Sequence, residues 1–272
     1  MARAAAHGRT TDPRFQDPIA IELLSDDDRA SVERLRNGEA PKSARENILH
    51  QTMKRRGEMM VVRTNWVDDV VRDTRATQVV ILGAGLDGRA WRMPELADAT
   101  VFEVDHPDTQ REKRARIASH RPIAREVRFV PVDFTKDSLA EALAAAAHDP
   151  SVPTNWIWEG VVMYLTREEI DATMEVVAAR SAPSSALAIV YVSRSPLYWL
   201  VGFLVRRLGE PFRSAFTAAQ MASLLQAFGF DVVADEDVPT AAKRSTPAVQ
   251  AAVRPMRHVR LVHAVRADLT RP

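Results

Sequence analysis

From Thr77 onward, short runs of β-branched and other apolar residues alternate with charged stretches in which apolar residues recur at helical spacing. Short apolar runs are typical of buried strands, and their alternation with helices predicts βαβ units around a mainly parallel sheet. The pattern predicts seven strands, at Gln78–Leu82, Thr100–Val104, Val127–Val132, Asn155–Trp158, Leu187–Val192, Asp231–Ala234 and His258–Val265.

Helices are predicted between these strands, at Pro107–His120, Ser138–Ala147 and Arg167–Arg180. Thr166 and Glu169 have the spacing of a helix-capping pair, which places the start of the third helix. We expect the helices to cover both faces of the sheet. The predicted fold class is therefore α/β and Rossmann-like, with a seven-stranded, mostly parallel sheet.

Two regions lie outside this alternation, and both have a mainly helical pattern. A helix is expected at Arg45–Arg72, whereas the polar segment Asp235–Pro255, with its three prolines, is expected to loop. We predict a single domain. Its expected parts are a helical N-terminal cap (1–76), a cofactor-binding core (77–194), a helical lid insertion after the fifth strand (195–228) and the last strands of the sheet (229–272).

The amino-acid composition favours a protein that acts on small molecules. The 272 residues carry 37 Lys and Arg against 36 Asp and Glu, so a formal net charge of +1 gives no global field that would attract nucleic acid. Cysteine is absent, which excludes disulfides and cysteine-based metal sites, and no metal is expected. No stretch has the length of a membrane span or of a secretory signal core, so we expect a cytoplasmic enzyme.

The most informative segment is the glycine-rich turn after the first strand. Gly83 and Gly85 remove the Cβ atoms that would keep a ligand away from the backbone N–H groups. At the end of the second strand stand Glu103 and Asp105, and Asp105 lies 22 residues after Gly83. That separation is close to the one at which a nucleotide fold places the acidic residue for the ribose hydroxyls. The segment predicts a nucleoside-containing cofactor.

A nicotinamide-dependent oxidoreductase is one alternative, because Gly83, Gly85 and Gly88 satisfy the spacing of the dinucleotide fingerprint. Asp87 lies within that turn, however, and is a poor neighbour for a pyrophosphate but a reasonable partner for a sulfonium or ammonium group. Strand-end carboxylates also often cap the following helix, so each one has a structural alternative.

Four motifs together resemble the leucine carboxyl methyltransferase family, which includes protein phosphatase methyltransferases and tetracenomycin-type polyketide O-methyltransferases. They are Leu82-Gly-Ala-Gly-Leu-Asp-Gly-Arg-Ala-Trp-Arg, Phe102-Glu-Val-Asp-His-Pro, Val132-Asp-Phe and Trp158-Glu-Gly-Val-Val-Met-Tyr-Leu. The resemblance implies a class I methyltransferase fold and S-adenosyl-L-methionine as cofactor. Gly88 departs from it, because the family more often has Thr or Ser at that position.

The resemblance also implies a role for each residue that matches a motif. Arg63 would bind the cofactor's methionine carboxylate and Glu159 its ammonium group. The remaining assignments are Gly83 and Gly85 against the methionine portion, Asp105 on the ribose hydroxyls, and Asp133 with Phe134 on the adenine. Tyr164 would point toward the methyl acceptor.

Methyl transfer is an in-line displacement that depends mainly on alignment in a water-poor pocket. A carboxylate acceptor needs a cation or a hydrogen-bond donor, for which Arg63, Tyr164 and Arg194 are the candidates, whereas a hydroxyl acceptor would favour a base such as His106. The apolar run Leu197–Leu208 indicates either a hydrophobic methyl acceptor or a homodimer interface.

Three functions therefore remain open from the sequence. The favoured one is an O-methyltransferase that acts on a carboxylate or hydroxyl of a small, polyketide-like or lipid-like acceptor, as in natural product biosynthesis. The second is a methyltransferase for a protein C-terminal carboxylate, and the third is the NAD(P)-dependent oxidoreductase.

Overall fold

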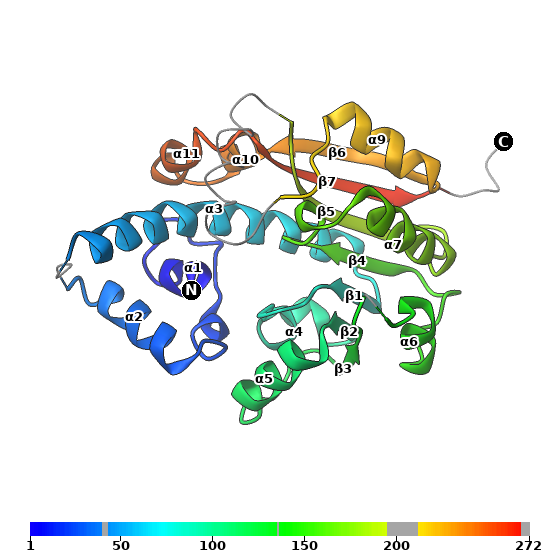
Figure 1. Cartoon of the computed structure of the whole chain (residues 1–272), viewed down its shortest axis with the longest axis horizontal. Coiled ribbons are helices and arrows are strands. Elements are labelled where there is room, and N and C mark those ends of the chain that lie inside the picture. Colours follow the sequence, from blue (N-terminus) through cyan, green and yellow to red (C-terminus); the bar gives the residue numbers. More distant parts are fainter. Residues whose placement is uncertain (40–42, 135, 195–211, 268–272) are drawn as a thin grey trace.

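The computed structural model describes residues 1–39, 43–134, 136–194 and 212–267. A single seven-stranded sheet runs through the molecule in the order β3-β2-β1-β4-β5-β7-β6 (Figure 1). Strands β1 to β5 pair in parallel, and β7 runs antiparallel to both of its neighbours. The strands are β1 (Gln78–Leu82), β2 (Thr100–Asp105), β3 (Glu126–Pro131), β4 (Thr154–Trp158), β5 (Ala186–Val192), β6 (Phe230–Asp237) and β7 (Val259–Arg266).

The predicted fold class is confirmed. The apolar runs were readable because the central strands are buried on both faces, so that all residues of β1 and of β4 are buried. Val80 of β1 pairs with Phe102 of β2 on one side and with Trp156 of β4 on the other. This register brings the carboxyl ends of β1, β2 and β4 to one edge of the sheet.

Helices cover both faces of the sheet, as predicted. One face packs against α3 (Ala44–Thr74), whose Val62, Trp66 and Val70 join the core with Val79 and Ile81 of β1. The other face packs against α7 (Arg167–Ala179) and α9 (Ala218–Ala227), which contribute Met174 and Leu225 among other residues. The remaining helices of the core are α4 (Arg89–Arg92), α5 (Pro107–Ile117) and α6 (Leu139–Ala145).

Local signals explain the helix boundaries. The Thr166 hydroxyl accepts from the Glu169 N–H while the Glu169 carboxylate accepts from the Thr166 N–H, so the predicted capping box of α7 is present. The segment predicted to loop is instead largely helical, since β6 continues to Asp237 and is followed by α10 (Val238–Ala241) and α11 (Pro247–Val253). Pro239 and Pro247 lie in the first turns of these helices, where proline favours helix initiation rather than a loop.

The N-terminal part of the chain packs along the long helix α3, which is 31 residues and about 46 Å in length. It contains α1 (Ala2–Ala6), the 3₁₀ turn η1 (Pro18–Ala20) and α2 (Asp26–Arg36), which are drawn in blue in Figure 1. Helix α1 packs closely on α3 at Gly57, where a Cβ would lie in van der Waals contact, 3.6 Å from both the Ala2 carbonyl oxygen and the Ala6 Cβ.

Part of the predicted insertion after β5 is described, namely 212–216 and helix α9. The apolar run Leu197–Leu208 lies outside the described residues. None of the helices in the described ranges has the length and apolar character needed to span a bilayer.

Candidate functional site

The glycine turn lies at the carboxyl edge of the sheet and takes a conformation that glycine permits. Gly83 and Gly85 have φ angles of +68° and +47°, in the left-handed region. A Cβ at Gly83 would collide with the Val161 side chain, whereas a Cβ at Gly85 would meet nothing closer than 3.9 Å. Gly83 is therefore required for packing against the loop after β4, and Gly85 leaves open space above the turn.

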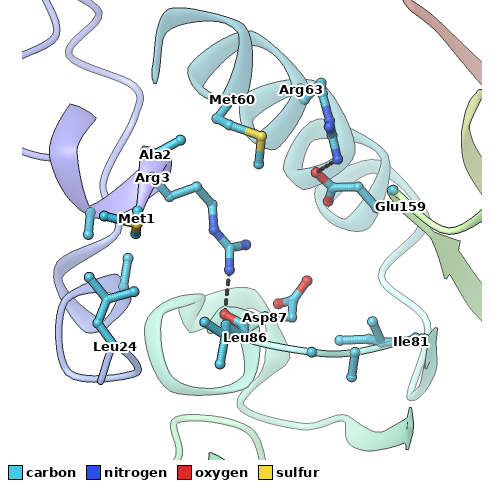
Figure 2. Close-up of a pocket in the computed structure, with 16 residues that line it drawn as sticks. Met1, Ala2, Arg3, Leu24, Met60, Arg63, Ile81, Leu86, Asp87 and Glu159 are labelled. Carbon is cyan, nitrogen blue, oxygen red and sulfur yellow. Dashed lines mark hydrogen bonds and ion pairs between the residues drawn. The ribbon is translucent and has the colours of Figure 1, made fainter. Parts of the chain in front are cut away.

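That space is a cavity of about 320 Å³ (Figure 2). Its floor is the glycine turn, one wall is α3, and the loop after β4 and the first residues of the chain close it. In Figure 2, Arg63 and Glu159 point toward one another on one side, and Arg3 reaches across to donate to the Leu86 carbonyl oxygen. The cavity is lined by Met1, Ala2, Arg3, Ala4, Ala20, Leu24, Met60, Arg63, Ile81, Gly83, Ala84, Gly85, Leu86, Asp87, Glu159 and Gly160.

A nearly buried ion pair marks the wall of this cavity. Arg63 Nη2 lies 3.0 Å from Glu159 Oε1, and the two side chains are 12% and 8% exposed. Gly160 allows this approach, because a Cβ there would lie 3.1 Å from Arg63 Nη2. The structure thus brings together the two residues expected at the methionine end of the cofactor, which are 96 positions apart in the sequence.

Arg89 is a site residue that sequence reasoning missed. It begins α4 directly after the glycine turn, is fully buried, and lies 2.8 Å from both Glu159 Oε2 and Asp68 Oδ1. Its third carboxylate partner is Asp87. Asp87 is thus already paired with a cation of the chain itself, although its place in the turn suggested a cationic ligand. The sequence did contain a signal for this residue: Arg89 follows Asp87 by two positions in a segment of otherwise small and apolar residues, which is compatible with a buried ion pair.

These charges shift the ionisation of the carboxylates. Burial by itself raises the pKa of Glu159, but the guanidinium groups of Arg89 and Arg63 outweigh it and hold that pKa below the ordinary value of 4.5. Burial likewise opposes ionisation of Asp87, and the Arg89 charge again dominates and lowers its pKa. Glu159 is therefore a carboxylate at neutral pH in spite of its burial.

The ion pairs continue away from the cavity in an alternating chain. Asp68 binds Arg92 at 2.7 Å, Arg92 lies 3.7 Å from Asp17, and Asp17 lies 3.5 Å from Arg3, which lines the cavity. The N-terminal segment is further fixed to the turn at Gly88, where a Cβ would collide with the Ile19 side chain. This contact gives a structural reason for glycine at the position where the resemblance favours Thr or Ser.

Asp105 is the last residue of β2, and Asp133 follows the neighbouring strand β3 by two residues. The Asp105 Oδ2 accepts from the backbone N–H of Gly85, and its Oδ1 accepts from the N–H of His106 at 2.6 Å. Asp133 Oδ2 lies 2.9 Å from Lys136 Nζ and 4.0 Å from His106 Nε2. Phe134 follows with half of its side chain exposed. Of these three predicted residues, Asp105 contacts the glycine turn, and all three lie outside the lining of the cavity.

Glu103 does not join this group. It precedes the end of β2 by two residues, is fully buried, and lies 2.6 Å from Lys113 Nζ of α5. Burial raises the pKa of Glu103 to about 7. The Lys113 ammonium also donates to the Asp87 carbonyl oxygen at 2.6 Å, so the pair supports the turn from below instead of facing a ligand.

The two residues predicted on the acceptor side lie at the same edge of the sheet but outside the cavity lining. Tyr164 belongs to the 3₁₀ turn η3 (Val162–Tyr164) after β4, and its ring centroid is 5.8 Å from that of Phe212. Arg194 follows β5, and its Nε donates to the Ala215 carbonyl oxygen at 3.0 Å. Both side chains therefore contact the segment 212–216. Within the described parts of the chain, no cluster of side chains suits a metal ion.

The family model of the leucine carboxyl methyltransferases matches residues 1–178. A Mycobacterium avium protein named as an S-adenosyl-L-methionine-dependent methyltransferase is 35% identical over 237 residues, which cover 84% of this chain and 76% of the relative. A Frankia alni protein with the same description is 36% identical, over 67% of this chain and 63% of its own length.

Solved structures show the same fold at low sequence identity. A DUF574 family protein from Streptomyces avermitilis superposes with a TM-score of 0.61 and 14% identity, covering 98% of this chain and 97% of its own. The 1,6-didemethyltoxoflavin N1-methyltransferase of Burkholderia thailandensis, solved with its substrate and S-adenosylhomocysteine, gives a TM-score of 0.50 at 15% identity, over 90% and 92% of the two chains.

Proposed function

We propose that the cavity at Arg63, Gly85 and Glu159 holds the methionine end of the cofactor. The chain belongs to the leucine carboxyl methyltransferase family and is an S-adenosylmethionine-dependent methyltransferase. We further propose that the methyl group is transferred to an oxygen atom of a small, apolar acceptor. The proposal about the cofactor rests on the geometry of the cavity. The proposal about the acceptor concerns the residues beside the cavity that would bind the molecule to be methylated.

The donor set of the cavity suits an amino-acid zwitterion. Glu159 offers a carboxylate to the ammonium group, and Arg63 offers a guanidinium to the carboxylate. Among the described residues, the Arg63 Nε is buried and makes no hydrogen bond, so Glu159 does not satisfy the whole guanidinium group. Gly85 leaves the space above the turn open. The mutual ion pair of Arg63 and Glu159 is the single observation that carries this assignment.

The neighbouring strand ends suit the nucleoside. Asp105, whose carboxylate accepts from the Gly85 N–H at the glycine turn, would accept from the ribose hydroxyls. Asp133 would accept from the adenine amino group, and the half-exposed Phe134 ring would cover the base. In this arrangement the cofactor spans three adjacent strand ends, those of β4, β1 and β2, and reaches the end of β3.

When bound, the cofactor supplies an electrophilic methyl group on a sulfonium. The protein's part is to align the acceptor oxygen with it and to exclude water. The apolar side chains of Leu24 and Met60 line the cavity and limit access of water there. A carboxylate acceptor is ionised at neutral pH and needs no general base, so Tyr164 and Arg194 would orient it by hydrogen bonding and charge.

Calorimetry with S-adenosylhomocysteine tests the cofactor site. We expect Glu159→Gln to weaken binding about 10-fold or more, because the cofactor's ammonium group loses its charged partner. Glu168→Gln is the matched control, since Glu168 is an exposed glutamate at the start of α7. Equal affinities in the wild type and the Glu159 variant would contradict the assignment, and binding of NAD(H) without binding of S-adenosylhomocysteine would restore the oxidoreductase alternative.

Methyl transfer from labelled cofactor to three acceptor panels tests the second proposal. Apolar carboxylic acids and phenols are compared with amines of the same skeleton and with peptides that end in a free leucine carboxylate. We expect base-labile methyl esters or stable methyl ethers from the apolar oxygen acceptors. Transfer to the amines alone would exclude O-methylation, and transfer to the peptides alone would favour the protein carboxyl methyltransferase.

A further inference from the structure

Arg89 joins three carboxylates that come from three separate elements. Asp68 belongs to α3, Asp87 to the glycine turn and Glu159 to the loop after β4. The Arg89 side chain has no exposed surface, and its Nε, Nη1 and Nη2 each face a different carboxylate. A guanidinium suits this task because its donors lie in one rigid plane, which fixes the directions of its partners.

The two oxygens of Glu159 have different partners. Oε2 lies 2.8 Å from Arg89 Nη2, away from the cavity, while Oε1 lies 3.0 Å from Arg63 Nη2 at the cavity wall. Arg89 does not line the cavity, whereas Arg63 and Glu159 both do (Figure 2). Oε2 of Glu159 is therefore fixed by Arg89 on the side away from the cavity, and Oε1 lies on the side that a ligand would occupy.

We propose that Arg89 is a positioning residue for cofactor binding, which fixes the Glu159 carboxylate through Oε2 so that Oε1 receives the ammonium group of the cofactor. This inference rests on the proposed role of Glu159. Arg89 acts through Glu159 and does not touch the cofactor. Because Arg89 also begins the helix after the glycine turn, it holds the turn and the end of β4 at a fixed separation.

The two oxygens of Glu159 need separate partners when a ligand binds. When Arg63 turns to the ligand's carboxylate, the ligand's ammonium group takes its place at Oε1, and Oε2 still needs a fixed partner, because an unpaired polar atom in a buried site is disfavoured. Arg89 keeps its contact with Glu159 in that state, since it is anchored independently. Asp68 provides the anchor: it binds Arg89 at 2.8 Å and Arg92 at 2.7 Å, and it is itself buried.

The test compares the affinities of two ligands that differ in whether they carry the amino-acid end that Glu159 is proposed to bind. S-adenosylhomocysteine carries the amino-acid end, and 5′-methylthioadenosine lacks it. For Arg89→Lys we expect the affinity for S-adenosylhomocysteine to fall about 10-fold, as for the loss of a charge-assisted hydrogen bond, and that for 5′-methylthioadenosine to change less than about twofold. Arg92→Lys is the matched control, because the Arg92 side chain is only 4% exposed and binds Asp68 but does not contact Glu159.

A double variant separates positioning from general structural support. If Arg89 acts through Glu159, adding Arg89→Lys to Glu159→Gln causes no further loss of S-adenosylhomocysteine affinity. Should Arg89→Lys fail to fold, Asp68→Asn replaces it, since this change loosens Arg89 without touching Glu159, and we expect a loss of about threefold for the same ligand alone.

The outcomes distinguish the two proposals. A loss in Glu159→Gln without a loss in Arg89→Lys or Asp68→Asn would overturn the role of Arg89 and leave the cofactor site intact. Equal weakening of both ligands would show that Arg89 only supports the fold. An unchanged affinity in Glu159→Gln would overturn the cofactor site and the role of Arg89 together.

Discussion

The backbone N–H of Gly85 donates to Oδ2 of Asp105, so the glycine turn after β1 and the end of β2 are joined by one carboxylate. The sequence separates these residues by 20 positions. Their contact places the proposed ribose ligand beside the proposed methionine site, which is the arrangement that a single adenosyl-methionine cofactor requires.

Replacing Asp105 tests this arrangement. We expect Asp105→Ala to weaken S-adenosylhomocysteine binding by about 1–3 kcal/mol, because the ribose hydroxyls lose their acceptor and the Gly85 N–H loses its partner. Isothermal titration calorimetry measures the change. Asp108→Ala serves as the control, since that carboxylate lies three residues later, in the first turn of α5, and is 65% exposed. A similar loss in both variants would indicate a nonspecific effect of charge.

Gly83 and Gly8 allow a comparison of backbone strain with steric collision. Both have φ angles in the left-handed region, +68° and +75°, but only a Cβ at Gly83 would strike a neighbouring side chain. We expect Gly8→Ala to cost about 1 kcal/mol of unfolding free energy through strain alone. Gly83→Ala is expected to cost about 3 kcal/mol or more and to abolish S-adenosylhomocysteine binding, because the turn and the Val161 loop must separate.

Urea denaturation of the two glycine variants, followed by tryptophan fluorescence, measures both costs. The collision at Gly83 involves Val161, so Val161→Ala should recover part of the stability lost in Gly83→Ala. Equal destabilisation by the two glycine substitutions would mean that the turn can move away from the Val161 loop without cost.

His148 is predicted to make stability depend on pH. Burial, followed by the nearby Arg180 charge, lowers the pKa of His148 to about 4 from the ordinary value of 6.5. Its Nε2 lies 3.0 Å from Thr154 Oγ1, and Arg180 Nε donates to its Nδ1 at 3.3 Å, which is the pattern of a neutral imidazole. Between these two pKa values the unfolded chain binds the proton more readily, so stability falls as pH decreases from 6.5 toward 4.

The effect of His148 is measured as a difference, because the raised pKa of Glu103 gives an opposite slope over much of the same range. The unfolding free energy of the wild type, minus that of His148→Asn, should increase by about 2 kcal/mol from pH 4 to pH 6.5 after allowance for screening, and then level off. Denaturant titrations at several pH values provide both curves. A difference that is constant with pH would show that His148 titrates normally in the folded chain.

Local sequence patterns determined the order of the elements and the edge of the sheet that carries the proposed cofactor site. Strand β5 is a continuous apolar run, and β1 after Gln78 and β4 after Asn155 are apolar too, because both faces of the sheet are covered. Thr166 with Glu169 carries its capping signal within four residues. Gly83 and Gly85 were recognisable because few other residues tolerate their backbone angles. Each of these features is visible within a short stretch of the chain.

Tertiary structure alone decided which charges face the cavity and the glycine turn. Glu103 and Asp105 are two residues apart on the same strand face, yet Lys113 covers the first and the second reaches the turn. Arg89 was inconspicuous in the sequence because its three carboxylate partners lie 2, 21 and 70 positions away. The fate of a charged side chain depends on which partner reaches it inside the fold, and sequence spacing does not encode that distance.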